Sequence, residues 1–203
     1  TGAKVVFCDV DPKTYNMDPE KIVAVITSHT KAILPVHLFG LPCDMDAIMK
    51  IARKHKLAVV EDAAQSFGST YKGRPSGVIG DMGCFSFYPT KNLGGAGAGG
   101  MVITRSKKLA NKIRLLRNHG SHVKYRHELA GVNSRLDEIQ AAWVGIKLKY
   151  IDQWNNARRT HAKAYDEAFR VLPIHTPVNS ENSLSNYHLY SIRLNRRDKL
   201  AEF

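Results

Sequence analysis

The feature that most constrains this 203-residue sequence is a regular alternation of strand-like and helix-like runs over its first ninety residues. Runs rich in branched apolar residues predict buried strands at residues 4–10, 31–38 and 57–63. Between them lie two predicted helices, which begin at Asp18 and Asp44, residues well suited to N-caps. Strands and helices in alternation with short connections predict an α/β domain built on a mostly parallel sheet.

The second half of the sequence predicts longer helices and fewer strands. Residues 82–88 and 99–104 predict two further strands, and residues 107–120 predict a basic helix that ends at its glycine. Ser134 is the expected N-cap of a helical pattern of nearly forty residues. This is too long for an ordinary globular helix, so we expect it to kink or to bridge two domains. Residues 186–194 alternate and predict a strand of a second, incomplete domain.

These elements predict two domains. We expect residues 1–150 to form a large domain without its N-terminal part, and residues 151–203 to form a linking helix and the start of a smaller C-terminal α/β domain. Because the chain begins with Thr1 and ends within a helix-like pattern, we expect a fragment of a longer protein. Neither a membrane-spanning apolar run nor a signal peptide is visible, so we expect a cytoplasmic protein without membrane contact.

The net charge of +12 favours anionic partners, such as nucleic acids, phosphorylated metabolites or acidic lipids. The basic residues are dispersed, however, and lack the interleaved aromatic residues of nucleic-acid platforms. We therefore expect no nucleic-acid partner. The three scattered cysteines have no metal-ligand spacing and are typical of reduced thiols, so we expect no metal site.

One lysine lies in an unusual place. Lys91 follows a predicted strand with alternating aromatic residues and precedes a run of glycines. Asp62 ends the third predicted strand, Gln65 follows it, and the next strand delivers Ser86. Because the carboxyl ends of parallel strands share one edge of a sheet, an acid, an amide, a hydroxyl and an amine are expected there.

Pyridoxal phosphate fits this set of groups. The cofactor needs a lysine for its Schiff base and a carboxylate that faces the pyridine nitrogen. Its phosphate needs hydroxyls and backbone N–H groups. Taken singly, Asp62 would fit equally well as the cap of a turn, and Lys91 as a solvated surface residue.

Longer motifs carry a resemblance. The stretches "VEDAAQSFGSTYKGRPSGVIGDMGCFSFYPTKNLG" and "GVNSRLDEIQAA" resemble the DegT/DnrJ/EryC1/StrS family of sugar aminotransferases. "ILPVHLFGLPCDMDAI", "RNHGS" and "KLKYIDQWNNARR" support the match, which extends from residue 4 to about residue 194. The resemblance implies the fold of the large domain of an aspartate-aminotransferase-like, pyridoxal-phosphate-dependent transferase.

The resemblance also implies roles for individual residues. Lys91 would form the Schiff base and move the proton during catalysis, Asp62 would pair with the pyridinium nitrogen, and Gln65 would lie beside the ring. Ser86 would bind the cofactor phosphate.

Three further residues are implied at the margins of the site. Asn133 resembles a residue that reaches the phosphate in the neighbouring subunit's site, with Arg135 beside it, which implies a homodimer with shared active sites. The alternative is that Asn133 only helps Ser134 to begin the long helix. His188 would either face the sugar nucleotide or lie in the core.

The resemblance implies transfer of an amino group from an amino acid, L-glutamate, to a nucleotide-linked keto-sugar. The narrowest form is a dTDP-3-keto-6-deoxyhexose, used in lipopolysaccharide, other cell-surface polysaccharide or antibiotic-sugar biosynthesis. Lys91 argues against the dehydratase branch of the family, in which histidine replaces this lysine. Asp62, Ser86 and Lys91 together argue against a regulatory or binding protein that has kept only the fold.

Overall fold

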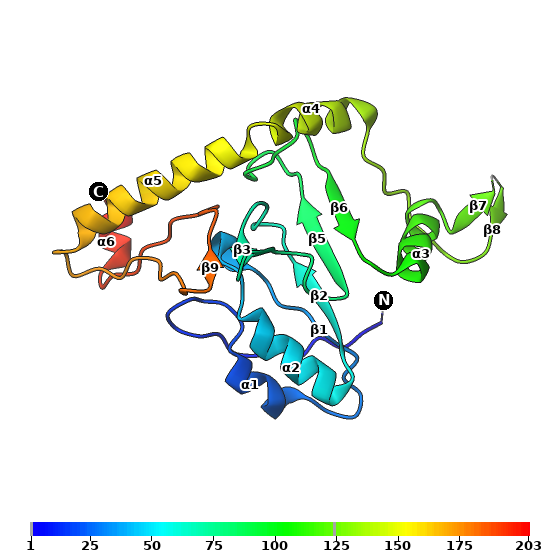
Figure 1. The fold of residues 1–203 in the computed structure, drawn as a ribbon, viewed down its shortest axis with the longest axis horizontal. Helices are drawn as coiled ribbons and strands as arrows, with labels where there is room; N and C mark the ends of the chain where they lie inside the picture. The colour runs from blue at the N-terminus through cyan, green and yellow to red at the C-terminus, as the bar shows by residue number, and fades with distance from the viewer. Residues whose placement is uncertain (1, 124) are drawn as a thin grey trace.

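The computed structural model describes residues 2–123 and 125–203. Its main sheet has four strands in the order β1-β2-β5-β6 (Figure 1). The pairs β1–β2 and β2–β5 are parallel, whereas β6 is antiparallel to β5. The sheet is therefore mixed but mostly parallel, as the sequence predicts. Its strands are β1 (Ala32–Ile33), β2 (Ala58–Asp62), β5 (Met82–Ser86) and β6 (Gly100–Ile103).

Two helices pack beside the first strands, α1 (Pro19–Val25) and α2 (Met45–His55). Both begin where the sequence predicts, because the carboxylate of Asp18 accepts the N–H of Glu20 and that of Asp44 accepts the N–H of Ala47. The apolar faces of these helices and of the strands form the larger hydrophobic core. Its fully buried members include Met45, Ile48 and Val59.

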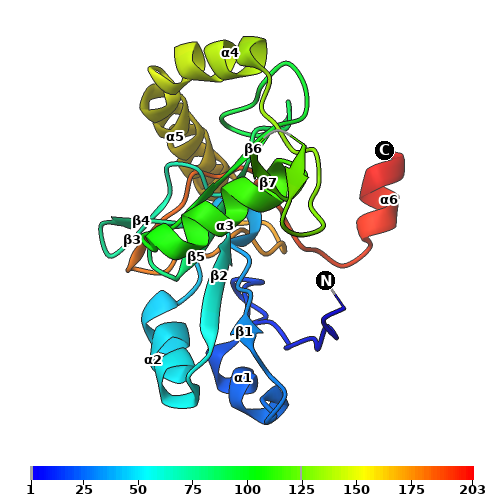
Figure 2. The ribbon, with the colours of Figure 1, turned by 90° about the vertical axis from the view of Figure 1, so that its right-hand side faces the viewer.

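Two helices of the second half, α4 and α5, lie at the opposite end of the sheet from α1 and α2 (Figure 2). The long helical pattern is broken at residues 149–150, so the predicted kink is confirmed. Gly120 ends the turn after the preceding helix with a φ of +70°, where a Cβ would lie 1.7 Å from the carbonyl oxygen of Leu129. The elements are α3 (Lys107–Arg117), β7 (Ser121–Val123), β8 (Arg126–His127), α4 (Glu138–Leu148) and α5 (Ile151–Phe169).

A small antiparallel sheet, β4-β3-β9, ties the C-terminal segment to the connection between β2 and β5. The remaining elements are a 3-10 turn η1 (Leu38–Gly40), β3 (Thr70–Tyr71), β4 (Arg74–Pro75), β9 (Ser183–Leu184) and α6 (Arg197–Glu202). No helix among the described residues is long and apolar enough to cross a membrane.

Two predicted strands are wrong. Within residues 4–10 only Val10 pairs, as an isolated bridge to Met17, and the side chain of Phe7 is exposed. This apolar run has no neighbouring strand among the described residues, and a strand requires one. Within residues 186–194 the one pairing is a bridge from Arg193 to His175. That segment is instead held by side-chain hydrogen bonds of Asn186 and by single backbone hydrogen bonds to the η1 turn.

The predicted N-cap at Ser134 is also wrong. The backbone N–H of Ser134 donates to the carbonyl of Arg117, so this residue belongs to the connection that runs beside α3. Helix α4 begins three residues beyond the predicted start, after Asp137, whose side chain makes no capping hydrogen bond.

Candidate active site

The carboxyl ends of β2 and β5 point the same way and carry two of the predicted residues (Figure 1). Asp62 ends β2 and is in register with Cys84, and Ser86 ends β5 two residues later. Oδ1 of Asp62 accepts the N–H of Ala64 at 3.0 Å, and Oγ of Ser86 accepts the N–H of Tyr88 at 3.2 Å. Each side chain therefore turns toward the loop that follows its own strand.

Asp62 keeps one carboxylate oxygen available. Among the described residues Oδ2 has no hydrogen-bond partner, and the side chain is half-buried. Burial and then the charge of Asp62 raise the pKa of the thiol of Cys84, the residue in register with Asp62 on the neighbouring strand β5. A half-buried carboxylate with a free oxygen can accept a hydrogen bond from a cationic ring.

Lys91 lies in a tight loop between β5 and β6. Its backbone N–H donates to the carbonyl of Tyr88 at 2.9 Å, and the N–H of Gly95 donates to the carbonyl of Phe87 at 2.8 Å. A second lysine, Lys147 of α4, donates from Nζ to the carbonyl of Gly94 at 2.6 Å. The backbone of the loop is thus fixed at both ends, and Lys91 itself is half-buried.

His188 lies beside this loop. Its Nδ1 is 3.1 Å from Oδ1 of Asn92, the residue after Lys91. Burial, then the positive charges of Lys91 and Arg158, lower the pKa of His188 from its ordinary 6.5 to about 4. The imidazole is therefore neutral at pH 7. The sequence allows two roles for His188, contact with the sugar nucleotide or a place in the core. Its burial and its hydrogen bond to Asn92 favour the core.

Gln65 occupies the turn after β2. Its side-chain oxygen accepts the N–H of Phe39 at 2.8 Å, and Phe39 has a left-handed φ of 57°. Its backbone carbonyl accepts a hydrogen bond from Nδ2 of Asn186, two residues before His188. The fold thus brings five of the predicted residues to one end of the sheet: Asp62, Gln65, Ser86, Lys91 and His188.

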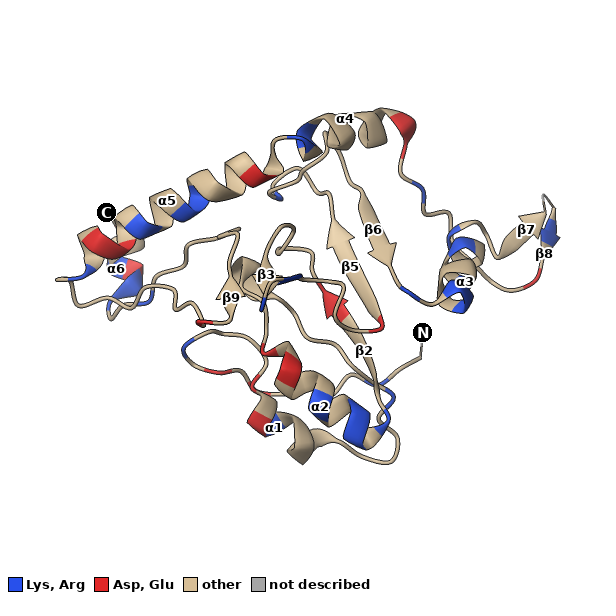
Figure 3. Cartoon of the chain, in the orientation of Figure 1, with Lys and Arg blue, Asp and Glu red and all other residues tan. Residues whose placement is uncertain are grey.

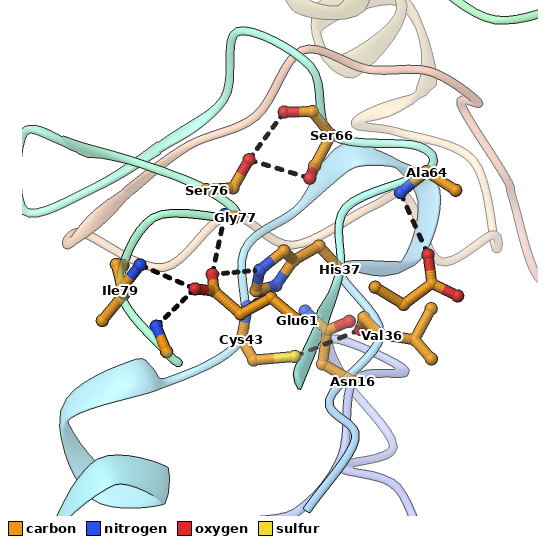
Figure 4. Close-up of polar contacts among 12 residues, drawn as sticks. Asn16, Val36, His37, Cys43, Glu61, Ala64, Ser66, Ser76, Gly77 and Ile79 are labelled. Atoms are coloured by element: carbon orange, nitrogen blue, oxygen red, sulfur yellow. Dashed lines mark hydrogen bonds and ion pairs between the residues drawn. The ribbon is translucent and has the colours of Figure 1, made fainter. Parts of the chain in front are cut away.

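A fully buried carboxylate lies directly before Asp62 (Figure 4). Glu61 and His37 both have 0% exposure, and Nε2 of His37 is 2.9 Å from Oε2 of Glu61. Nδ1 of His37 accepts the N–H of Cys43 at 3.1 Å, so the proton of the ring lies on Nε2 and is donated to Glu61.

The loop before β5 completes this network. Glu61 accepts the backbone N–H groups of Gly77 at 2.7 Å, Ile79 at 2.6 Å and Gly80 at 2.5 Å. Burial alone would raise the pKa of Glu61, but the hydrogen bonds from His37, Gly80 and Gly77 outweigh it and lower this pKa below its ordinary value. Glu61 is therefore an ionised carboxylate with four donors.

Glu61 follows an apolar run, so its burial would be unfavourable without a partner, but the sequence alone does not identify that partner. Successive strand residues point to opposite faces, so of Glu61 and Asp62 one had to face the interior. The opposite orientations of Glu61 and Asp62 could therefore have predicted that one of the two carboxylates has a buried partner on β1 or on a nearby loop.

Asn133 and Arg135 lie elsewhere, on what we call the basic segment, residues 105–135. The backbone of Asn133 forms an isolated bridge with Asn118, and the guanidinium of Arg135 donates to Oδ1 of Asn118 at 3.3 Å. Both predicted residues are exposed. Lys and Arg predominate along α3 and β8 (Figure 3), and Glu128 is the single acidic residue of this stretch of sequence. Among the described residues, neither a hydrogen bond nor an ion pair joins Asn133 or Arg135 to Lys91.

Comparison with known proteins identifies the family. A model of the DegT/DnrJ/EryC1/StrS aminotransferase family matches residues 1–203. The chain belongs to this family.

Members of the DegT/DnrJ/EryC1/StrS family provide close relatives. The chain is 48% identical over 206 residues to a pleiotropic regulatory protein of Geobacillus stearothermophilus, covering 100% of this chain and 55% of the relative. It is 47% identical over 197 residues to a UDP-N-acetyl-3-dehydro-α-D-glucosamine 3-aminotransferase of Acidithiobacillus ferrooxidans, covering 97% and 53%. This chain thus spans about half the length of the curated relatives it matches.

Solved structures of the family have the same fold. The structure of Streptomyces venezuelae DesV in complex with a ketimine intermediate matches with a TM-score of 0.93 and 45% identity, covering 96% of this chain and 53% of that one. The α/β, aminotransferase-like fold predicted from the sequence is therefore confirmed.

The family depends on pyridoxal phosphate, and the residues at the sheet end fit that group. The carboxylate oxygen of Asp62 that has no partner among the described residues suits a protonated ring nitrogen, and the hydroxyl of Ser86 suits a phosphate. The amine of Lys91, in a half-buried loop beside a neutral histidine, suits covalent attachment of an aldehyde.

Proposed function

We propose that this chain is part of a pyridoxal-phosphate-dependent aminotransferase, which moves an amino group from L-glutamate to a nucleotide-linked keto-sugar. The observation that carries the proposal is the placement of Lys91 and Asp62, with Gln65 and Ser86, at one end of the sheet in a member of this family. The relative named as an aminotransferase of a UDP-linked 3-keto-sugar supports this class of substrate. The sequence favours a dTDP-3-keto-6-deoxyhexose within the class.

The residues of the chain would divide the work as follows. When bound, pyridoxal phosphate supplies an electron sink for the bond that breaks at the amine-bearing carbon. Nζ of Lys91 would attach the cofactor and then carry the proton to and from that carbon. Oδ2 of Asp62 would accept a hydrogen bond from the ring nitrogen and keep its proton in place, and Ser86 would donate its hydroxyl to the phosphate.

The partner site is a separate part of the proposal. Asn133 is exposed on the basic segment and makes no hydrogen bond to Lys91 among the described residues, which suits a residue that serves a second subunit. A homodimer with two-fold symmetry would place each basic segment at the partner's site, with Arg135 beside Asn133. We place this enzyme in the cytoplasm, in the synthesis of amino sugars for lipopolysaccharide, other surface polysaccharides or antibiotics.

A second candidate is a regulatory protein, because the relative in G. stearothermophilus is named as one. The two candidates differ at Lys91. An enzyme needs an amine that binds the cofactor covalently, whereas a regulatory protein that has lost catalysis does not.

The deciding experiment uses the intact protein. We expect a visible absorbance band that borohydride shifts, with the reduced adduct mapped to Lys91 by mass spectrometry. Lys91→Ala should lose this band and all turnover while it stays folded, and Lys149→Ala, an exposed lysine, should keep both. Incubation with glutamate and a panel of nucleotide keto-sugars would then identify the substrate. Turnover and colour retained in Lys91→Ala would show that the proposal is wrong.

A further inference from the structure

Three asparagines far apart in the sequence meet in the interior beside Lys91. Asn92 follows Lys91 in its loop, Asn155 lies on α5, and Asn186 lies in the C-terminal segment. Their exposed fractions are 9%, 0% and 0%. Buried amides are costly unless each polar atom finds a partner, so their hydrogen bonds define what this asparagine cluster holds together.

Asn92 connects the Lys91 loop to the other two asparagines. Its Nδ2 donates to Oδ1 of Asn155 at 2.8 Å and to the backbone carbonyl of Asn186 at 3.1 Å. Its Oδ1 is the partner of Nδ1 of His188. Because the amide donates twice on one side, its orientation is fixed and the ring nitrogen of His188 must be the donor on the other side.

Asn155 and Asn186 connect the same cluster to the turn that follows Asp62. Nδ2 of Asn155 donates to the carbonyl of Phe67 at 3.1 Å. Nδ2 of Asn186 donates to the carbonyls of Gln65 and Phe67, each at 3.0 Å. The cluster therefore bridges two loops, one that begins three residues after Asp62 and one that contains Lys91.

The packing around the cluster leaves little room for movement. A Cβ on Gly68 would lie 2.4 Å from Nδ2 of Asn155, and a Cβ on Gly40 would lie 1.8 Å from Oδ1 of Asn186. Glycine at these two positions lets the backbone approach the amides closely. Bonds in such an interior are strengthened by the low local dielectric and are lost only at high cost.

We propose that Asn92, Asn155 and Asn186 are positioning residues that fix the Lys91 loop against the turn after Asp62. The proposal rests on the proposed function, because it takes Lys91 and Asp62 as the amine and the carboxylate of the cofactor site. Since Asn155 and Asn186 come from α5 and the C-terminal segment, these parts of the chain set the separation of amine and carboxylate without touching either.

The test measures the loop directly. Asn155→Leu keeps a similar volume but removes one acceptor from Asn92 and one donor from Phe67. We expect hydrogen exchange in a peptide covering residues 88–95 to become about tenfold faster, since one net hydrogen bond is worth about that factor. The rate at which pyridoxal phosphate is trapped by borohydride on Lys91 should fall as well.

Asn16 provides the matched control. It is buried to a similar degree, donates to the carbonyl of Leu41 and accepts the N–H of Leu38, and has no bond to residues 88–95. Asn16→Leu should lower the melting temperature by a comparable amount and leave exchange in 88–95 and trapping on Lys91 unchanged. A purely structural role for Asn155 would make the two variants alike in both measurements.

Two further comparisons make the result decisive. If Asn155→Leu does not fold, Asn92→Ala removes the same link from the less buried side and takes its place. If both fold, the effects of the two changes on exchange should not add fully in the double variant, because the bond from Asn92 to Asn155 is already lost in each single variant. Unchanged exchange in 88–95 would overturn the positioning proposal, whereas wild-type protein without an adduct on Lys91 would instead overturn the proposed function.

Discussion

The carboxyl end of β2 and the basic segment hold predicted site residues in opposite physical settings. At the end of β2, Glu61 is fully buried and has four donors, and Asp62 follows it on a strand fixed on both sides. On the basic segment, Asn133 and Arg135 are exposed and both meet Asn118. Contacts within one chain thus fix the position of Asp62, whereas Asn133 is exposed and accessible to a second chain.

The largest effect should come from breaking the buried side of this comparison. Glu61→Ala leaves the imidazole N–H of His37 and three backbone N–H groups without a partner in the interior. We expect the free energy of unfolding to fall by about 3–5 kcal/mol, measured by denaturant titration. Arg135→Ala should change it by less than about 0.5 kcal/mol, because the side-chain hydrogen bond that it makes among the described residues, to Asn118, is exposed. Equal losses in the two variants would contradict the contrast.

Asp62→Asn tests whether the residue that follows Glu61 has a chemical role. An amide cannot supply the negative charge that keeps a ring nitrogen protonated, so we expect turnover to fall about a hundredfold or more. The affinity for pyridoxal phosphate should change much less, as measured by fluorescence titration. Turnover close to that of wild type would mean that Asp62 only accepts the N–H of Ala64 and shapes the turn.

The contrast between the two regions also explains what the sequence could predict. Strands β2 and β5 and helix α2 were predictable because apolar runs and the Asp44 cap are local signals. The grouping of Asp62, Ser86 and Lys91 was predictable as well, because neighbouring parallel strands end at one edge of the sheet.

What failed depends on contacts that are distant in the sequence. Residues 4–10 have strand composition, but composition does not supply a neighbouring strand. Residues 186–194 alternate, but Asn186 makes hydrogen bonds through its amide that hold the segment without a ladder. The partner of Glu61 was hidden for the same reason, because His37 lies 24 residues away and approaches only when β1 and β2 pair.

Titration of His188, which is hydrogen-bonded to Asn92 of the Lys91 loop, should contribute to the pH dependence of stability. Its pKa is about 4 in the folded protein and about 6.5 when unfolded, so the unfolded chain binds the proton first as the pH falls. The contribution of a neutral His188 is therefore fully present above pH 6.5 and is lost progressively as the pH falls from 6.5 toward 4.

His188→Gln removes this titration while an amide N–H can still reach Asn92. From pH 6.5 to pH 4, we expect the variant to lose about 1–2 kcal/mol less stability than wild type, after allowance for screening by solvent near the Lys91 loop. Chemical denaturation at several pH values measures the difference. Parallel curves for the two proteins would mean that His188 titrates as an exposed histidine does.

The smallest expected difference from wild type, a factor of about two in activity per dimer, tests the exposed Asn133 on the basic segment. In the proposed homodimer, we expect Lys91→Ala and Asn133→Ala each to be inactive when both subunits carry the same change. The two variants are co-expressed with different affinity tags, and the heterodimer is isolated by two purification steps.

If Asn133 serves the partner's site, one site of each heterodimer collects both changes and the other keeps its own Lys91 and the partner's Asn133. That intact site should restore up to half of the wild-type activity per dimer. If Asn133 acts within its own subunit, each site carries one change and no activity returns, and the exposed position of Asn133 on the basic segment would then have no part in a shared site.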